Sequence, residues 1–323
     1  QRLSFRVNRV QITMIGDSLT QGRDHANRTG STFTEFRRKD MTKKKLIKLL
    51  VDLDLRPSRK LGQNFLIDKN ILDIIVGHAA TAATGNFIEI GAGTGVLTER
   101  LAALGRVTAI EYDNRLAEYL QNRFSRNDQV TIVHKDAVRL DYDQLADGPY
   151  DCIANLPYAA STAILGRLLA TANRPAFILV LLQREMAERL TAEPRSKAYG
   201  SLTVRLRLCY DVKIVKQVSA NVFWPRPEVD SSLVAMQLRD DAADCDLSRR
   251  LSALTRLAFS QRRKKLPGVL ARHYHPSTVA DTFDRFGIDA DVRADALPIA
   301  GYRQLAETLP APEQHSTDSD TQE

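Results

Sequence analysis

The sequence Glu-Ile-Gly-Ala-Gly-Thr-Gly at residues 89–95 joins a short apolar segment, residues 87–90, to a segment with helical character. A buried strand followed by a glycine-rich turn and a helix is typical of nucleotide-binding α/β folds. Glycines let the backbone approach a ligand closely, and a helix N-terminus favours a carboxylate or phosphate. The turn alone does not identify the ligand, because NAD, FAD and S-adenosylmethionine sites all use one.

Strand-like and helix-like segments alternate along the chain beyond this turn. Strands are predicted at 87–90, 107–110, 130–133, 152–154 and 177–182, with helices near 95–104, 113–124, 160–172 and 183–192 between them. Such alternation indicates βαβ units and a parallel sheet. Two further strands are predicted at 212–218 and 233–238, and the chain beyond residue 240 has helical character to about residue 309. The predicted fold class is α/β with a small all-helical C-terminal domain.

Polar residues follow the predicted strands of this sheet. Glu111 follows the second strand, Asp136 the third, and Asn155 begins the turn Asn-Leu-Pro-Tyr at 155–158 after the fourth. Because ligands bind beyond the carboxyl ends of such strands, we expect these side chains to line one cleft. Glu111 is placed to accept from ribose hydroxyls and Asp136 from an adenine amino group. In the turn, the Asn155 amide oxygen and a backbone carbonyl could accept from the amine of a second planar base stacked on Tyr158.

Composition limits the kind of protein. The 323 residues are 43% hydrophobic and 26% charged, which is typical of a soluble globular chain large enough for two domains. No apolar run approaches the roughly 20 residues of a membrane span. The cysteines at 152, 209 and 245 are far apart, so we expect no disulfide framework, no metal site and a reducing, cytoplasmic location. The net charge of +7 favours a polyanionic partner.

The first 41 residues differ from the rest. They show no sustained periodicity, and Met-Ile-Gly-Asp-Ser-Leu at 14–19 resembles the nucleophile block of GDSL hydrolases without that family's downstream Asp-x-x-His context. We expect a disordered or non-native extension here. A helix is predicted from residue 46, headed by Lys43, Lys44 and Lys45. The predicted organisation is an extension at 1–41, a sheet domain at 42–240, a helical domain at 241–310 and a polar tail at 311–323.

Seven motifs together resemble those of the small-subunit rRNA adenine dimethyltransferases, the KsgA type. The resemblance runs from about residue 56 to about residue 301, and its marks are Gly62–Leu66, Glu89–Gly93, Glu111 with Asp136, Asn155–Tyr158, Ser196–Gly200, Phe223–Ser231 and Phe259–Lys264. Ala92 stands where many relatives have proline. Pro267-Gly268 stands where relatives often carry more polar residues, which leaves the detail of RNA contact there open.

The resemblance implies a Rossmann-like class I methyltransferase sheet, S-adenosylmethionine as methyl donor, and two adjacent adenines near the 3′ end of small-subunit rRNA as targets. It places five side chains and two glycines around the cofactor: Asn64, Leu66, Gly91, Gly93, Glu111, Asp136 and Asn155. The target adenine would be held by Asn155, Leu156, Pro157 and Tyr158, with Phe223 stacked on its other face. The implied partners are small-subunit rRNA and the immature small ribosomal subunit, bound by a monomer.

Basic residues in two parts of the chain predict contact with RNA phosphates, namely Lys43, Lys44, Lys45, Arg59 and Lys60, and the run Arg262, Arg263, Lys264 and Lys265. Two alternatives remain open. The related large-subunit rRNA methyltransferases that confer macrolide resistance share the cofactor turn and an Asn-Leu-Pro-Tyr-like motif. The protein could also act mainly as a non-catalytic ribosome-assembly factor.

Overall fold

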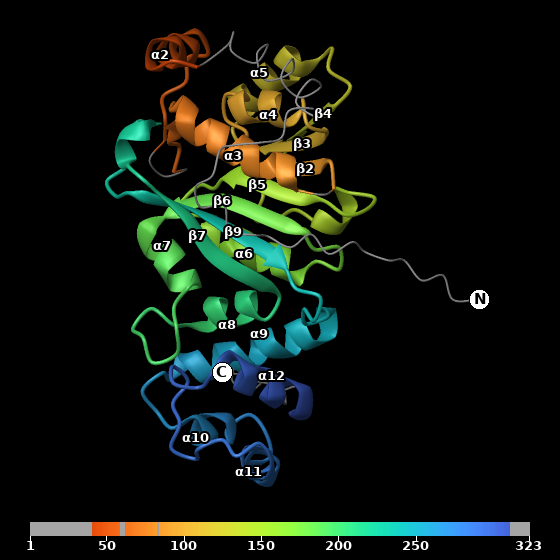
Figure 1. Ribbon diagram of the computed structural model, residues 1–323, viewed down its shortest axis with the longest axis vertical. Helices are drawn as coiled ribbons and strands as arrows, with labels where there is room; N and C mark the ends of the chain where they lie inside the picture. The colour runs from red at the N-terminus through yellow and green to blue at the C-terminus, as the bar shows by residue number, and fades with distance from the viewer. Residues whose placement is uncertain (1–40, 59–61, 83, 311–323) are drawn as a thin grey trace, which may run out of the picture. The chain divides into compact units, whose positions relative to one another are not determined.

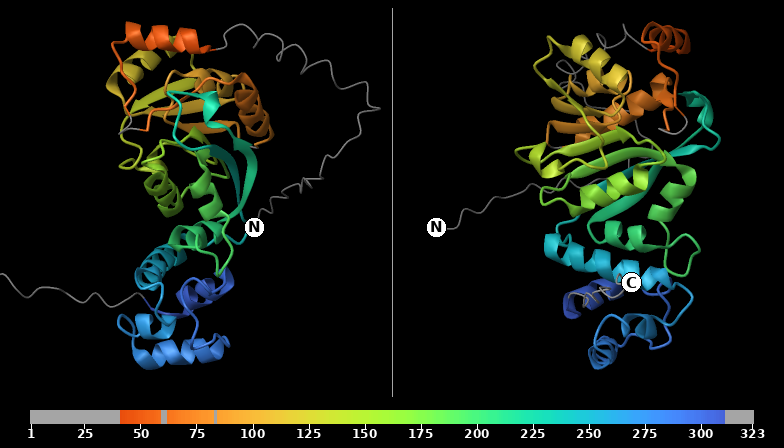
Figure 2. Two further views of the ribbon diagram at one scale, coloured as in Figure 1. Left: turned by 90° about the vertical axis from the view of Figure 1, so that its left-hand side faces the viewer. Right: turned by 180° about the vertical axis from the view of Figure 1, so that it is seen from behind.

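A computed structural model describes residues 41–58, 62–82 and 84–310 of the chain (Figures 1 and 2). Its main element is a seven-stranded sheet with the spatial order β4-β3-β2-β5-β6-β9-β7. In chain order the strands are β2 (Asn86–Ile90), β3 (Arg106–Glu111), β4 (Val130–His134), β5 (Asp151–Asn155), β6 (Phe177–Gln183), β7 (Tyr210–Val218) and β9 (Ser231–Leu238). All seven predicted strands lie in this sheet, and the predicted α/β class is confirmed.

Five strands of the sheet, β2 to β6, are parallel, as their alternation with helices predicts. The last two differ, because β9 lies between β6 and β7 and runs antiparallel to both. A loop rather than a crossover helix connects β7 to β9, and such a connection suits antiparallel neighbours. The chain moves from β2 outward to β3 and β4 and then returns to place β5 on the other side of β2. This reversal puts a ligand crevice at the carboxyl ends of β2 and β5.

Helices cover both faces of the sheet (Figure 1). One face packs against α3 (Lys69–Thr81), α4 (Val96–Leu101) and α5 (Asn114–Phe124), and the other against α6 (Ser161–Ala170), α7 (Arg184–Leu190) and α8 (Ser201–Arg207). Strand β6 shows why helices are needed on both faces. Leu179 and Leu181 pack in the core that contains α3, α4 and α5, and Ile178, Val180 and Leu182 pack in the core that contains α6, α7 and α8. Side chains alternate between the faces of a strand, so a run of apolar residues must be covered on both sides.

A third, smaller core holds the N-terminal part of the described chain against the sheet domain. Helix α2 (Lys43–Asp52) buries Leu46 and Leu50 beside Leu116 of α5, and Trp224 packs against the same group. The two-residue strands β1 (Phe65–Leu66) and β8 (Phe223–Trp224) pair antiparallel beside it. The sequence does not predict this pair, because two residues carry no periodicity.

Up to residue 310, where the described part of the chain ends, four helices follow the sheet: α9 (Cys245–Ser260), α10 (Leu266–Leu270), α11 (Pro276–Arg285) and α12 (Ile299–Thr308). Their apolar side chains join the same core as those of α6 and α8. Phe259 of α9 stacks on Tyr302 of α12, with ring centroids 5.9 Å apart, and lies 6.1 Å from the ring of Tyr199. The helical composition predicted beyond residue 240 is therefore observed, whereas the division into two domains stays a prediction.

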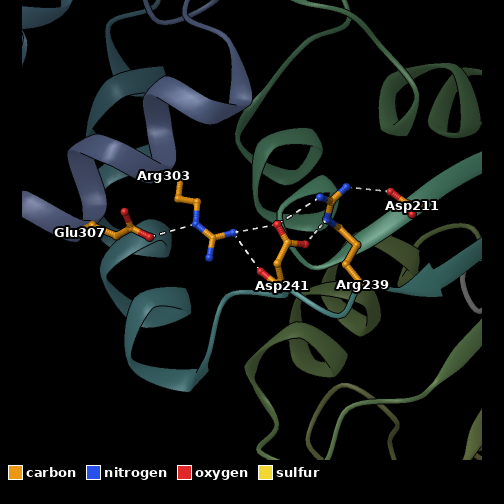
Figure 3. A network of polar contacts seen from close by, with 5 residues as sticks. All are labelled: Asp211, Arg239, Asp241, Arg303 and Glu307. Atoms are coloured by element: carbon orange, nitrogen blue, oxygen red, sulfur yellow. Dashed lines mark hydrogen bonds and ion pairs between the residues drawn. The ribbon is translucent and has the colours of Figure 1, made fainter. Parts of the chain in front are cut away.

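A network of ion pairs also connects the sheet edge to α12 (Figure 3). Arg239, after β9, donates to Asp211 of β7 and to Asp241, each at 2.8 Å. Arg303 of α12 donates to the Asp241 carbonyl at 2.8 Å and to Glu307 at 2.9 Å. Partly exposed ion pairs of this kind each contribute little to the free energy of unfolding. The network therefore affects the orientation of α12 more than the stability of the fold.

Candidate active site

A cavity of about 350 Å³ lies at the carboxyl ends of the parallel strands. Its walls come from the ends of β2, β3, β4 and β5 and from residues 62–66. The volume is within the range of cofactor sites, about 300–1,000 Å³. Every residue predicted to bind the cofactor lines it: Asn64, Leu66, Gly91, Gly93, Glu111, Asp136 and Asn155. The tertiary structure therefore brings together residues that span some ninety positions of the chain.

The glycine-rich turn forms the floor between β2 and α4. Backbone N–H groups of Gly91 and Ala92 both donate to the Ile110 carbonyl, at 2.8 and 3.1 Å, which fastens the turn to β3. Gly91 has φ +77°, where a side chain is strained, and a Cβ there would lie 3.6 Å from the Asn155 carbonyl oxygen. The positive φ is therefore the reason for glycine at position 91, since a Cβ there would make only ordinary van der Waals contact with the end of β5.

The Glu111 carboxylate is held by three backbone donors. Its Oε2 accepts from the N–H of Gly93 at 2.8 Å, and its Oε1 from the N–H groups of Tyr112 and Asp113, both at 2.9 Å. Burial raises the pKa of Glu111, and the three hydrogen bonds oppose that rise by stabilising the charged form. The carboxylate is therefore oriented at the cavity wall, and one lone pair of Oε2 is left for a hydroxyl donor.

Asn155 is the last residue of β5 and faces the cavity. Its Nδ2 donates to the Asn64 carbonyl at 2.9 Å, which fixes the plane of the amide. Within the part of the chain that the structure describes, Oδ1 has no hydrogen-bond partner. A fixed amide with a free oxygen acceptor can hold an amino group at this position.

Two further polar side chains at the cavity are Asp136 and Tyr112. Asp136 Oδ1 accepts from the Val138 N–H at 2.9 Å, and Arg139 Nε lies 3.7 Å from its Oδ2. Tyr112 is 56% exposed and lines the cavity directly after Glu111. No role is predicted for Tyr112 from the sequence, although an aromatic residue next to the predicted ribose-binding acid was an available signal. Its ring offers a stacking surface to a planar ligand.

Glu89 also lines the cavity, and no ligand-binding role is predicted for it from the sequence. It is buried, and its Oε2 accepts from Thr98 Oγ1 at 2.6 Å. Burial raises the pKa of Glu89 to about 8; the Glu111 charge adds to the rise, and the Thr98 hydrogen bond opposes it. The signal in the sequence was a carboxylate inside an otherwise apolar strand.

The residues predicted to hold the target base are less uniformly placed. Pro157 lines the cavity, whereas Leu156, Tyr158 and Phe223 do not. Leu156 is buried in the core, and Phe223 is 2% exposed where it pairs with Leu66. Tyr158 is half-buried, with its hydroxyl 2.7 Å from Ser231 Oγ. Stacking of a base on Phe223 would require its ring to be uncovered, so that role stays a prediction.

The two groups of basic residues lie far apart in space, at opposite ends of the folded structure formed by the described residues from Met41 on. Lys43, Lys44 and Lys45 are exposed at the start of α2, and residues 262–265 lie between α9 and α10 (Figures 1 and 2). They do not form one continuous surface. Arg59 and Lys60 lie outside the described residues.

Arg262 differs from its neighbours in the basic run. Its Nη1 and Nη2 donate to the Lys197 and Ser196 carbonyls, both at 2.8 Å, and its Nε lies 3.3 Å from Asp295 Oδ2. Lys265 pairs with Asp291, while Arg263 and Lys264 are exposed. An RNA-binding role stays a prediction for all four, and Arg262 has an internal role that its sequence context does not show.

No group of three or more His, Cys, Asp or Glu side chains among the described residues is arranged to hold a metal ion. None of the helices described is both long and apolar enough to span a membrane.

Comparison with solved structures defines the class of protein. The fold is similar to that of "a dimethyladenosine transferase from Plasmodium falciparum", with a TM-score of 0.63 and 23% identity over 74% of this chain and 95% of the other. It is also similar to the "23S rRNA methyltransferase ErmE", with a TM-score of 0.58 and 24% identity over 76% and 99%. The chain therefore has the Rossmann-like fold of class I methyltransferases.

Sequence comparison gives the family. The model of the "Ribosomal RNA adenine dimethylase" family matches residues 55–310, and the chain belongs to that family. Two relatives carry the name "Ribosomal RNA small subunit methyltransferase A". The one from Bacillus pumilus is 37% identical over 78% of this chain and 90% of its own length. The one from Clostridium botulinum is 34% identical over 78% and 94%.

Proposed function

We propose that this protein transfers methyl groups from S-adenosylmethionine to the N6 amines of two adjacent adenines near the 3′ end of small-subunit rRNA. The observation that carries the proposal is Asn155, whose free Oδ1 lies at the rim of a cavity shared with Gly91, Glu111 and Asp136. Family membership and the names of the relatives support the choice of substrate.

The residues of the cavity fit the proposed methyl donor. Glu111, oriented by three backbone N–H groups, would accept from the ribose hydroxyls, and Asp136 from the adenine amino group. The exposed ring of Tyr112 would contact the adenine face, and the absence of a side chain at Gly91 keeps the wall beside Asn155 open. When bound, S-adenosylmethionine supplies a methyl group activated by its sulfonium charge.

Asn155 would act on the target amine by orientation. The N6 amine of adenine is a poor nucleophile, because its lone pair is delocalised into the ring. Hydrogen bonds from the NH2 group to Asn155 Oδ1 and to a backbone carbonyl of the 155–158 turn favour a pyramidal nitrogen with its lone pair directed at the methyl group. The amine becomes strongly acidic once it is alkylated, so its proton leaves to water after the C–N bond forms. We expect no dedicated general base.

Binding must also offset the cost of extruding the adenine from its stack, which is a few kcal/mol. Stacking on an aromatic side chain contributes about 1–3 kcal/mol per base. Tyr158, half-buried and three positions after Asn155, is the side chain proposed for this role. Phe223 would contribute only if the β1–β8 pair moved to uncover it.

The remaining parts of the proposal concern the partner. Exposed cations at the start of α2 and at Arg263 and Lys264 would contact RNA phosphates. We propose the immature small ribosomal subunit as the physiological substrate, the cytoplasm as the location, a monomer as the active form, and separate sheet and helical domains divided near residue 240.

Incubation of the protein with labelled S-adenosylmethionine and unmodified ribosomal subunits tests the function. We expect label in dimethyladenine at two adjacent positions near the 3′ end of small-subunit rRNA. Label in large-subunit rRNA instead would identify the macrolide-resistance type of activity. No transfer to either subunit, combined with restored subunit maturation by Asn155→Ala, would favour the assembly-factor alternative.

A further inference from the structure

Tyr158 is held by a residue far away in the sequence. Its hydroxyl lies 2.7 Å from Oγ of Ser231, 73 positions further along the chain. Ser231 is the first residue of β9 and is 0% exposed. The Ser231 hydroxyl is therefore shielded from solvent, and Tyr158 is the hydrogen-bond partner that the structure gives it.

The sheet explains why Ser231 is a rigid anchor. Ser231 pairs with Gln183 of β6 on one side and with Val218 of β7 on the other. Asn155, at the end of β5, pairs with Leu181 of the same strand β6. Tyr158 follows β5, and its hydroxyl contacts β9, which lies on the other side of β6 in the sheet. The contact thus joins the turn after β5 to the start of β9, near the end of β6 at which Asn155 pairs.

The other end of Tyr158 is fixed as well. Its carbonyl accepts from Ser161 Oγ at 3.1 Å, and a Cβ at Gly62 would come within 3.1 Å of its backbone nitrogen. The backbone is therefore packed against residue 62, while the hydroxyl is tied to β9. With the backbone and the hydroxyl both held, the ring has less rotamer freedom than an exposed tyrosine.

We propose that Ser231 is a positioning residue for methyl transfer, which holds the Tyr158 ring ready to stack on the extruded target adenine. The inference rests on the proposed function. A ring already fixed in its binding orientation loses no rotamer freedom when the base arrives, and the base is then presented to Asn155 in one orientation. Ser231 acts only through Tyr158 and needs no contact with the base.

The neighbouring residue provides a matched control. Ser232 is also buried on β9, but its Oγ donates to Gln217 Oε1 at 2.8 Å, on β7 and away from Tyr158. Ser232→Ala removes one buried hydroxyl and one hydrogen bond, as Ser231→Ala does. The two variants therefore differ in whether Tyr158 is released.

The experiment measures single-turnover methyl transfer to unmodified small subunits by Ser231→Ala, Tyr158→Phe, the double variant and Ser232→Ala. We expect Ser231→Ala and Tyr158→Phe each to lower the rate about three- to tenfold at saturating subunits, as expected when one side chain must be ordered on binding. The double variant should be no slower than the slower single variant, because both remove the same bond. The subunit KM and the calorimetric affinity for S-adenosylmethionine should change less than about twofold.

Three results would overturn the inference: a Ser231→Ala rate equal to that of Ser232→Ala, a double variant whose loss is the product of the two single losses, or a loss confined to KM. If Ser231→Ala fails to fold, Tyr158→Phe decides, since it keeps the ring and removes only the hydroxyl. Failure of the proposed function gives a different result, namely no methyl transfer by the unmodified protein.

Discussion

The end of β5 and the basic run at 262–265 are both marked by short sequence motifs, but their polar side chains are used differently. Asn155 donates to the Asn64 carbonyl and keeps its oxygen free at the cavity. Arg262, in contrast, uses its guanidinium to bind two backbone carbonyls and Asp295, and its side chain is only 33% exposed. A polar residue at a strand end is directed by the strand, whereas a long side chain in a turn can fold inward.

Substitution of Asn155 should have the largest effect. Asn155→Ala removes the acceptor that orients the target amine, and we expect methyl transfer to fall by about 10²–10³-fold or more, as for loss of one preorganised group in an active site. Calorimetry should show S-adenosylmethionine affinity within a few-fold of the unmodified protein. Near-normal turnover would refute the role assigned to Asn155.

Arg262→Ala tests whether the inward contacts of this side chain stabilise the fold. Loss of its three internal contacts leaves two carbonyls and a carboxylate without their donor, so we expect the free energy of unfolding to fall by about 2–3 kcal/mol. Arg263→Ala is the matched control, because Arg263 is exposed. It should leave unfolding unchanged and reduce the salt dependence of RNA binding. Equal unfolding curves for the two variants would mean that the Arg262 contacts contribute no stability.

Glu111 should affect cofactor binding more than chemistry. Glu111→Ala removes a charged acceptor for ribose hydroxyls, and calorimetry should show about 10- to 30-fold weaker S-adenosylmethionine binding. Glu111→Gln keeps one carbonyl oxygen for the backbone donors and should lose less affinity. An unchanged affinity in both variants would place the ribose elsewhere.

Glu89 gives a pH-dependent effect. Burial raises the pKa of Glu89 from 4.5 to about 8, so the folded state keeps a proton that the unfolded chain releases between these values. This group therefore lowers the free energy of unfolding as pH rises through that window, and its effect is constant above it. Glu89→Gln cannot ionise, so its stability relative to the unmodified protein should rise by about 1 kcal/mol per pH unit inside the window. Denaturant unfolding at several pH values measures this, and parallel curves would show that Glu89 titrates normally.

By itself, the sequence determined the seven strands of the sheet, the order of strands and helices along the chain, and seven residues that line the cavity: Asn64, Leu66, Gly91, Gly93, Glu111, Asp136 and Asn155. Apolar periodicity and glycine-rich turns are local signals, and the carboxyl ends of parallel strands meet at one edge. Glu111, Asp136 and Asn155 could therefore be assigned to one site before their distances were known.

Only the tertiary structure decided the antiparallel position of β9, the inward direction of Arg262, the burial of Phe223 and the bond from Tyr158 to Ser231. Each depends on which distant segments pack together, and that choice leaves no periodic pattern in the sequence. The physical reason is that a hydrogen-bond partner many positions away is set by strand register and core packing, which local propensity does not encode.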